Sequence, residues 1–525
     1  MPSLRHLLLA ASICLATPQM GAQRAPVILP SGTLEQRLRD DQLLGKTAAN
    51  GWLARDALGV RASSDSLPSG QLRWLRPVGV LSLGSSLPLA LEDLGLWTGR
   101  GINVYATAGF VTRWRLVQFV VAPEVTAVQN RPFDVRESRH PGFSPWAAPW
   151  YPPSNSIDLP SRPGTASEVT AHLGQSEVTV TARYVDFGLA STSERWGPGV
   201  FASTSLGAAS GGIPRVFARS AQPWRTSTGA FEWRLFGGSL TESRFFDHDP
   251  DNDHRALSGA LVVFSPRVAP SLSIGAGRLV QSPQQGRFVA PAEALRALTN
   301  WKQQRTPVTG ADSSTGDQLL TVFWRWISPA PGLELYSEWT RQELPRSLRD
   351  LIAAPFNSAG SLWGARWAIP REEGSLILGG EFLDVEQSTA YPNRPPREFG
   401  VGAAVPQGFT QRGQPLGPFS GPGSSAQFIT VARRRTTIDY GLVAARIRWN
   451  DGAFYQQPGA NFYRRDVSAI AGLHGSFERH RYIYGARLLF ERRFNYLFQN
   501  GFGQPGARPT VSISNLTLRF TAEPR

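Results

Sequence analysis

Apolar and polar residues alternate along most of the chain after residue 71. In the stretch 317–327, Val322, Trp324 and Trp326 fall on one face of an extended chain, and Thr321 and Arg325 fall on the other. The same two-residue period recurs across 332–342 and 482–491. This period is typical of β-strands with one apolar side, because successive side chains of a strand point to opposite faces. Here the second face carries charged residues.

The connections between these stretches alternate in length. Short ones are expected at 266–270, 328–331 and 370–374, and long ones at 242–255, 281–316, 343–358 and 386–422. Outer-membrane barrels have short periplasmic turns, long external loops, an apolar outer face and a polar lumen. A closed barrel also pairs every backbone group within lipid. The pattern therefore predicts an all-β, transmembrane antiparallel barrel over residues 71–525.

This alternation of loop lengths predicts 18 strands, with both termini on the periplasmic side. The strands are expected near 73–83, 102–112, 115–125, 176–187, 199–207, 214–221, 229–241, 256–265, 271–280, 317–327, 332–342, 360–369, 374–385, 424–432, 438–449, 464–475, 482–491 and 510–520.

The first seventy residues differ from the rest. Arg5 and His6 precede an apolar run over 7–16, which predicts a signal peptide over 1–22. Residues 23–70 are expected to form a small periplasmic helical segment. Within it, Leu34, Leu38, Leu43 and Leu44 alternate with charged residues as in an amphipathic helix, with Thr33 as N-cap and a second short helix over 51–58.

Composition supports an exported barrel. Charged residues make up only 18% of the chain, and its 16 Trp and 28 Phe suit the aromatic girdles of such barrels. The single cysteine, Cys14, lies in the signal peptide, so the mature chain has no disulfide and no thiolate metal site. The net charge of +14 indicates an anionic partner. For an exported protein, lipopolysaccharide or an acidic polysaccharide is expected rather than nucleic acid.

A short motif stands after the alternating stretch 177–185. Arg195, Trp196, Gly197, Pro198 and Gly199 follow it, and a second, weaker strand is expected from 199 to about 206. Proline fixes φ and glycine permits positive φ, so the motif predicts a rigid turn whose tryptophan packs on a wall.

The motif Arg-Trp-Gly-Pro-Gly resembles the signature of the capsule-assembly Wzi family. Glu242-Ser243 and Phe245-Phe246, which precede an acidic loop, add to the resemblance, whereas 207–212 departs from the asparagine-rich stretch usual in the family. The resemblance implies an 18-strand outer-membrane barrel that holds capsular polysaccharide. The last strand, ending at Phe520, looks like the segment that the barrel-assembly machinery recognises.

We therefore expect a non-catalytic, lectin-like protein of the cell outer membrane, involved in capsule or exopolysaccharide attachment. Its partners would be an acidic polysaccharide and outer-membrane lipid. The alternative is a porin-like channel for sugars or other solutes, and an outer-membrane hydrolase is a third, weaker hypothesis.

The aromatic residues Phe143, Trp146, Trp150 and Tyr151 are the candidate polysaccharide contacts. Their flat rings match pyranose faces, and arginine binds uronic carboxylates through two parallel hydrogen bonds. The alternative is that the rings pack the loop down as a lid over the lumen. The acidic run 247–254 imitates part of a calcium loop but lacks the glycine and the glutamate of an EF-hand, so no metal or cofactor is assigned.

Overall fold

The computed structural model describes most of the chain. The described residues are 32–47, 52–56, 68–91, 93, 95–151, 156–284, 286, 288–299, 316–328, 330, 332–342, 347–386, 398–402, 404–455, 464–498 and 512–524. The expected signal peptide over 1–22 lies outside them. Within the described part of the chain, no helix is long and apolar enough to cross a membrane.

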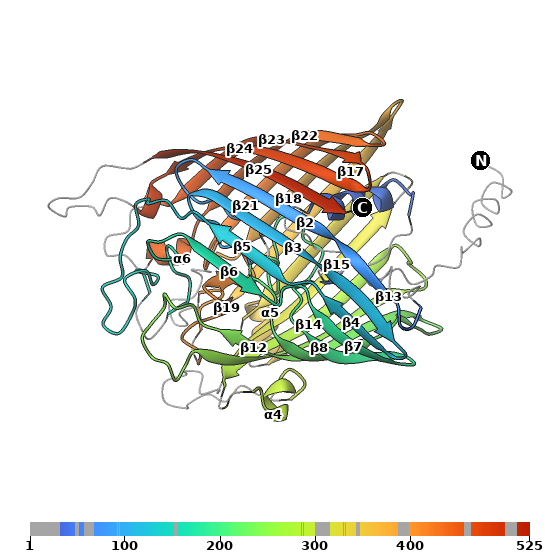
Figure 1. Ribbon diagram of the computed structural model, residues 1–525, viewed down its shortest axis with the longest axis horizontal. Coiled ribbons are helices and arrows are strands. Elements are labelled where there is room, and N and C mark those ends of the chain that lie inside the picture. Colours follow the sequence, from blue (N-terminus) through green and yellow to red (C-terminus); the bar gives the residue numbers. More distant parts are fainter. Residues whose placement is uncertain are drawn as a thin grey trace.

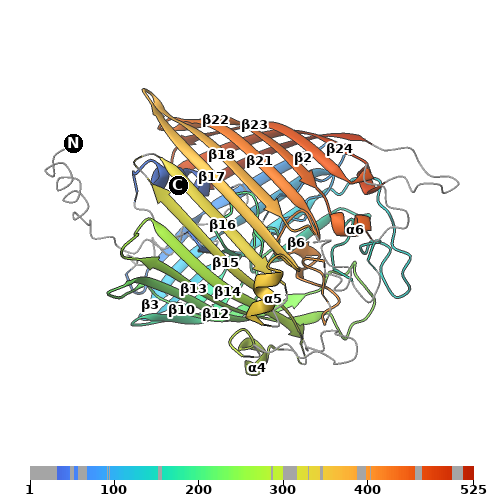
Figure 2. The same cartoon turned by 180° about the vertical axis from the view of Figure 1, so that it is seen from behind.

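A closed antiparallel barrel forms the body of the molecule (Figures 1 and 2). In the described residues its strands fill 18 positions. In ring order they are β2 (Leu72–Gly84), β3 (Gly101–Trp114), β4 with β5 (Val117–Val121, Glu124–Val128), β6 with β7 (Glu168–His172, Glu177–Ala182), β8 (Val185–Ala190), β10 with β11 (Arg215–Ser220, Trp224–Arg225), β12 (Gly229–Thr241), β13 (His254–Pro266), β14 (Leu272–Pro283), β15 (Asp317–Ser328), β16 (Leu333–Arg341), β17 (Ala359–Arg371), β18 (Gly374–Asp384), β21 (Ser425–Arg434), β22 (Ile438–Arg448), β23 (Val467–Arg479), β24 (Tyr482–Phe494) and β25 (Ile513–Pro524).

Three of these positions hold a strand that is broken into two pieces. β4 pairs with β7, and β5 pairs with β6. β4 and β5 therefore share one position of the ring, and β6 and β7 share the next. β10 and β11 both pair with β12. The ring closes where β2 meets β25, with Leu81 opposite Phe520.

The strands present opposite chemistry on their two faces. The outer face exposes large apolar side chains on many strands, among them Trp74, Phe187, Val322, Trp363, Ile429, Leu442, Leu473, Phe490 and Phe520. The inward residues Thr321, Arg325, Glu334 and Glu338 are buried. This arrangement confirms the expected apolar outer face and polar lumen, which is the architecture of an outer-membrane barrel.

The two ends of the barrel differ in the length of their connections. Two-residue turns at 183–184, 372–373 and 480–481 lie at one end, while the connections from β5 to β6, β14 to β15 and β18 to β21 are long. The short-turn end is periplasmic by the rule for such barrels. The helix α2 (Thr33–Leu43) lies at that end, near the last residues of β25 (Figure 1).

Smaller elements fill the lumen and the loops. They are β1 (Ala54–Asp56), β9 (Glu194–Trp196), β19 (Thr410–Gln411), β20 (Gln414–Pro415), α4 (Pro291–Ala294), α5 (Leu348–Ala353), α6 (Asp451–Tyr455) and the 3-10 helix η3 (Tyr496–Phe498).

The strand count expected from the sequence is right, but two assignments behind it are wrong. The single strand expected over 176–187 is two strands, β7 and β8, with a turn at Arg183 and Tyr184. The strand expected over 199–207 is absent, because that segment leaves the barrel wall and fills the lumen. The two errors offset each other in the count.

The N-terminal region also departs from expectation. Residues 54–56, placed in a second helix, form β1, which pairs with β9. Thr33 is the first helical residue rather than the cap, and Gly32 occupies the cap position. The helix α2 buries its charged residues, such as Arg39 and Asp40, because the lumen around it is polar.

Candidate functional site

The connection between β8 and β10, residues 191–214, turns back into the barrel and is called the inner connection here. It carries the Arg-Trp-Gly-Pro-Gly motif, and β9 within it pairs with β1 so that Arg55 lies opposite Arg195. β8 runs away from the short-turn end, so the motif reaches the lumen by re-entry from the outer mouth. The motif therefore lies in the lumen and follows a strand that runs toward the outer mouth.

Two carboxylates of the barrel wall hold the backbone of the inner connection. Glu338 on β16 accepts hydrogen bonds from the N–H groups of Gly199 (2.8 Å) and Thr204 (2.9 Å). Glu381 on β18 accepts from the N–H groups of 200, 201 and 202 at 2.6–2.9 Å. A loop inside a barrel has no sheet to satisfy its amides, so these carboxylates meet the hydrogen-bonding demand of buried backbone.

Trp196 anchors the inner connection to the wall. Its side chain is fully buried, and its indole N–H donates to Glu194 (3.0 Å). The ring meets Phe236 edge-on with centroids 5.8 Å apart and lies over Gly277, where any added Cβ would contact it. Gly197 follows with φ of 101°, a conformation that favours glycine.

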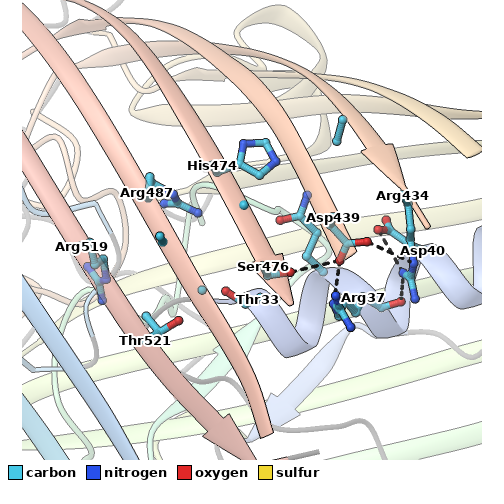
Figure 3. A pocket seen from close by; sticks show the side chains of 15 residues that line it. Thr33, Arg37, Asp40, Arg434, Asp439, His474, Ser476, Arg487, Arg519 and Thr521 are labelled. Atoms are coloured by element: carbon cyan, nitrogen blue, oxygen red, sulfur yellow. Dashed lines mark hydrogen bonds and ion pairs between the residues drawn. The ribbon is translucent and has the colours of Figure 1, made fainter. Parts of the chain in front are cut away.

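Buried ion pairs tie α2 to the same wall. Glu334 on β16 binds Arg39 of α2 as well as Arg325 (2.7 Å) and Arg366 (3.3 Å) of the wall. Asp40 of α2 binds Arg366 and Arg434, and the latter contact is 3.2 Å long. Figure 3 shows the part of this network around Asp40 and Arg434. The α2 residue Arg39 also donates to the carbonyl of Pro198 (2.7 Å), so α2 and the inner connection form one plug.

The outer mouth is covered by the described parts of 129–167 and 398–424, together called the outer lid. The lid touches the plug where the Gly207 N–H donates to the Leu416 carbonyl (2.6 Å). Its two segments meet where the Asp158 N–H donates to the Gln407 carbonyl (3.0 Å). Hydrogen bonds therefore connect the outer lid to the plug inside the lumen.

The structure places the four predicted aromatic residues in the outer lid but not at one point. Tyr151 is buried beside Ile157 and Phe498, and its hydroxyl donates to Asn450 (2.7 Å). Trp150 is half-buried against the same cluster and meets Phe498 edge-on.

The other two rings have separate neighbours. Phe143 packs edge-on against Phe246 with centroids 5.1 Å apart, and the Arg162 guanidinium lies 5.8 Å from the Trp146 ring. All four rings help to pack the lid, and only Tyr151 is fully enclosed.

One residue near these rings was missed by the sequence reasoning. The exposed guanidinium of Arg136 lies over the Trp150 ring, 4.3 Å from its centroid. Partial burial and, to a smaller extent, repulsion by the nearby Arg139 lower the pKa of Arg136. Residues 131–139 contain three arginines and two acidic residues, but nothing in this sequence shows that one of the arginines stacks on a ring.

Two acidic groups are buried where the outer lid meets the end of β12. Asp158 accepts from the backbone N–H (2.8 Å) and hydroxyl (2.5 Å) of Ser243, and Glu242 accepts from Gln407 (2.5 Å). Burial raises the pKa of Asp158 to about 6 and that of Glu242 to about 8. The negative charges of Asp158 and Asp247 add to the shift at Glu242.

The acidic run 247–254 forms a turn held by its own side chains. Asp247 and Asp249 accept from the backbone N–H groups two residues on, at 2.9 Å and 3.1 Å. Within the described residues, no group of three or more His, Cys, Asp or Glu is arranged to hold a metal ion.

Replacing Trp196 tests its anchoring role. Trp196→Ala should destabilise the barrel by about 3–5 kcal/mol, the usual cost of truncating a buried aromatic. Urea unfolding from lipid vesicles measures the change. Trp224→Ala, at a partly exposed position outside the lumen, is the matched control and should cost far less. Equal losses for the two variants would contradict the role.

Glu242 predicts a pH dependence of the outer lid. A raised folded-state pKa means that its stabilising contribution is complete below the unfolded value of about 4.3 and is lost as pH rises toward 8. Limited proteolysis of the lid should therefore quicken between pH 5 and about 8.5. Glu242→Gln, which keeps the bond from Gln407, should flatten this dependence. Parallel pH curves for variant and wild type would count against it.

No family model and no curated protein matches the sequence. Among solved structures, the chain is similar to Wzi, described as an outer membrane protein involved in group 1 capsule assembly in Escherichia coli and a carbohydrate-binding β-barrel. The TM-score is 0.58 at 12% identity, over 95% of this chain and 92% of Wzi.

Two further structures from Acinetobacter baumannii are less similar. OccAB1 has a TM-score of 0.39 at 9% identity over 87% of this chain and 97% of its own. The outer membrane channel DcaP has a TM-score of 0.32 at 9% identity over 86% of this chain and 96% of its own. The likeness to Wzi shows that this chain has the fold of that outer-membrane β-barrel.

Proposed function

We propose that this protein binds acidic polysaccharide at the outer face of the outer membrane, without catalysis, and so takes part in capsule or exopolysaccharide attachment. The observation that carries the proposal is the stacked pair of Arg136 and Trp150 on the outer lid. It offers a flat ring beside a positive charge that has no ion pair among the described residues, at the mouth of a filled barrel.

The chemistry of this pair fits a uronic or phosphorylated sugar. A guanidinium binds a carboxylate or phosphate through two parallel hydrogen bonds, and an aromatic ring packs on the apolar face of a pyranose. The neighbouring Arg139 repels Arg136, and an anion placed between them would relieve that repulsion. The half-buried rings of Phe143 and Trp146 lie apart from this pair on the outer lid, whereas buried Tyr151 belongs to the apolar cluster against which Trp150 packs.

The filled lumen supports binding over transport. α2, β1 and the inner connection occupy the barrel interior, and they are held by buried carboxylates of the wall. A solute would have to displace these groups to pass. The solved structure with a similar fold, Wzi, is described as carbohydrate-binding, which agrees with the same kind of role.

Glycan binding tests this function. The purified protein should bind an oligogalacturonate more tightly than a neutral maltodextrin of equal length, and binding should weaken with salt because exposed charges are screened. Trp150→Ala and Arg136→Gln should each weaken binding roughly five- to thirty-fold, as for a lost contact of about 1–2 kcal/mol. Trp146→Ala should have a smaller effect in the same direction.

The matched control is Trp224→Ala, which removes a partly exposed tryptophan at the opposite end of the barrel and should leave binding unchanged. Each variant must still shift its gel mobility on boiling, as a folded barrel does. Salt-insensitive binding, or wild-type affinity in both Trp150→Ala and Arg136→Gln, would overturn the proposal.

A further inference from the structure

A row of basic side chains crosses the lumen wall above α2. His474 on β23 is paired in register with Arg487 on β24, and Arg487 is paired with Arg519 on β25. All three face inward, because their neighbours Leu473, Leu488 and Phe520 are exposed on the outer face. Figure 3 shows the three side chains in sequence across the wall.

Like charges directly opposite one another on neighbouring strands are destabilising. Arg519 is compensated by an ion pair with Asp93. Among the described residues, Arg487 makes no hydrogen bond or ion pair. The charged groups that act on it electrostatically are Arg519, Asp93 and Glu523. Glu523 instead accepts from the Leu34 N–H at 2.9 Å.

Arg487 differs in this respect from the other arginines around it. Arg39 and Arg366 bind wall or plug carboxylates, and Arg195 donates to the Ala202 carbonyl (2.6 Å). Among the described residues, Arg487 thus lacks the carboxylate or carbonyl partner that each of these three arginines has. A half-buried cation without an ion-pair partner is costly, so its position requires an explanation.

The surroundings of Arg487 offer a further hydrogen-bond donor. Thr521 lies two residues beyond Arg519 on the inward face of β25, and its hydroxyl has no hydrogen-bond partner among the described residues. Arg487 and Thr521 line one cavity in this part of the lumen, together with Gln36 of α2. This cavity therefore brings together a guanidinium and a hydroxyl that lack acceptors within the described part of the chain.

We propose that this part of the lumen is a binding site for an oxyanion, either a phosphate or a carboxylate group, held by Arg487 with the hydroxyl of Thr521. An oxyanion supplies several acceptors and a negative charge at one point, which matches both unmet demands. The site lies below the inner connection and is separate from the outer lid. The proposal goes beyond polysaccharide binding at the mouth and does not depend on it.

Calorimetric titration of the full-length protein in detergent tests the site. Inorganic phosphate, glucuronate and glucose are each added at constant ionic strength set with chloride. Wild type should bind phosphate or glucuronate saturably and should not bind glucose. A response to phosphate alone would assign a phosphoryl ligand, and a response to glucuronate would assign a carboxylate; both support the site.

Two variants locate the binding. Arg487→Gln should weaken it at least tenfold, and Thr521→Val, which keeps the side-chain shape, should weaken it several-fold. Arg479→Gln removes an equal charge from an exposed residue at the end of β23 and should bind like wild type. Trp150→Ala, at the outer lid, should also leave this binding intact, which separates the site from the outer one.

Arg487→Gln is expected to fold, because it relieves the repulsion from Arg519. If it does not show the mobility shift of a folded barrel, Thr521→Val decides. The proposal fails if neither anion binds wild type better than glucose does. It also fails if the folded Arg487→Gln protein, or in its absence Thr521→Val, binds the anion as tightly as wild type.

Discussion

Buried pairing between arginines and carboxylates inside the lumen is the constraint on which the rest of the structure depends. The inward face of the wall is charged, and charges removed from water must be paired and hydrogen-bonded. Glu334 alone contacts three guanidiniums, one of them from α2. Removing one partner of such a pair typically costs about 3–5 kcal/mol, because the other charge is left uncompensated. The plug is therefore held as part of the folded barrel.

This pairing explains features that are unusual for a soluble protein. The charged side chains of α2 are buried, because the helix packs against the polar lumen wall rather than against an apolar core. Among the described residues, buried carboxylates outnumber buried arginines, so the positive excess behind the net charge of +14 lies on residues that are less buried. Function is better sought where a guanidinium lacks an ion pair, and within the described part of the chain Arg136 and Arg487 are two such positions.

The fold could be predicted from the sequence to the extent that period and loop length determine it. Alternation at Glu334, Glu338 and Arg325 assigned the inward face correctly. Strand borders were harder to place, since the turn at Arg183 and Tyr184 contains neither glycine nor proline. Part of the inner connection was predicted as a strand. Its backbone N–H groups instead donate to distant carboxylates, such as Glu381, and no local sequence pattern reveals such partners. For the same reason the sequence indicated ring-rich loops but not the stacking of Arg136 on Trp150.

The claim that the plug closes the lumen is tested most directly by electrical recording of the purified wild-type protein in planar lipid bilayers. The account predicts no sustained conductance steps, under conditions in which an open porin gives them, because α2 and the inner connection are fixed to Glu334, Glu338 and Glu381 of the wall. Stable, ohmic steps of porin size from the wild-type protein would contradict it and would favour a channel.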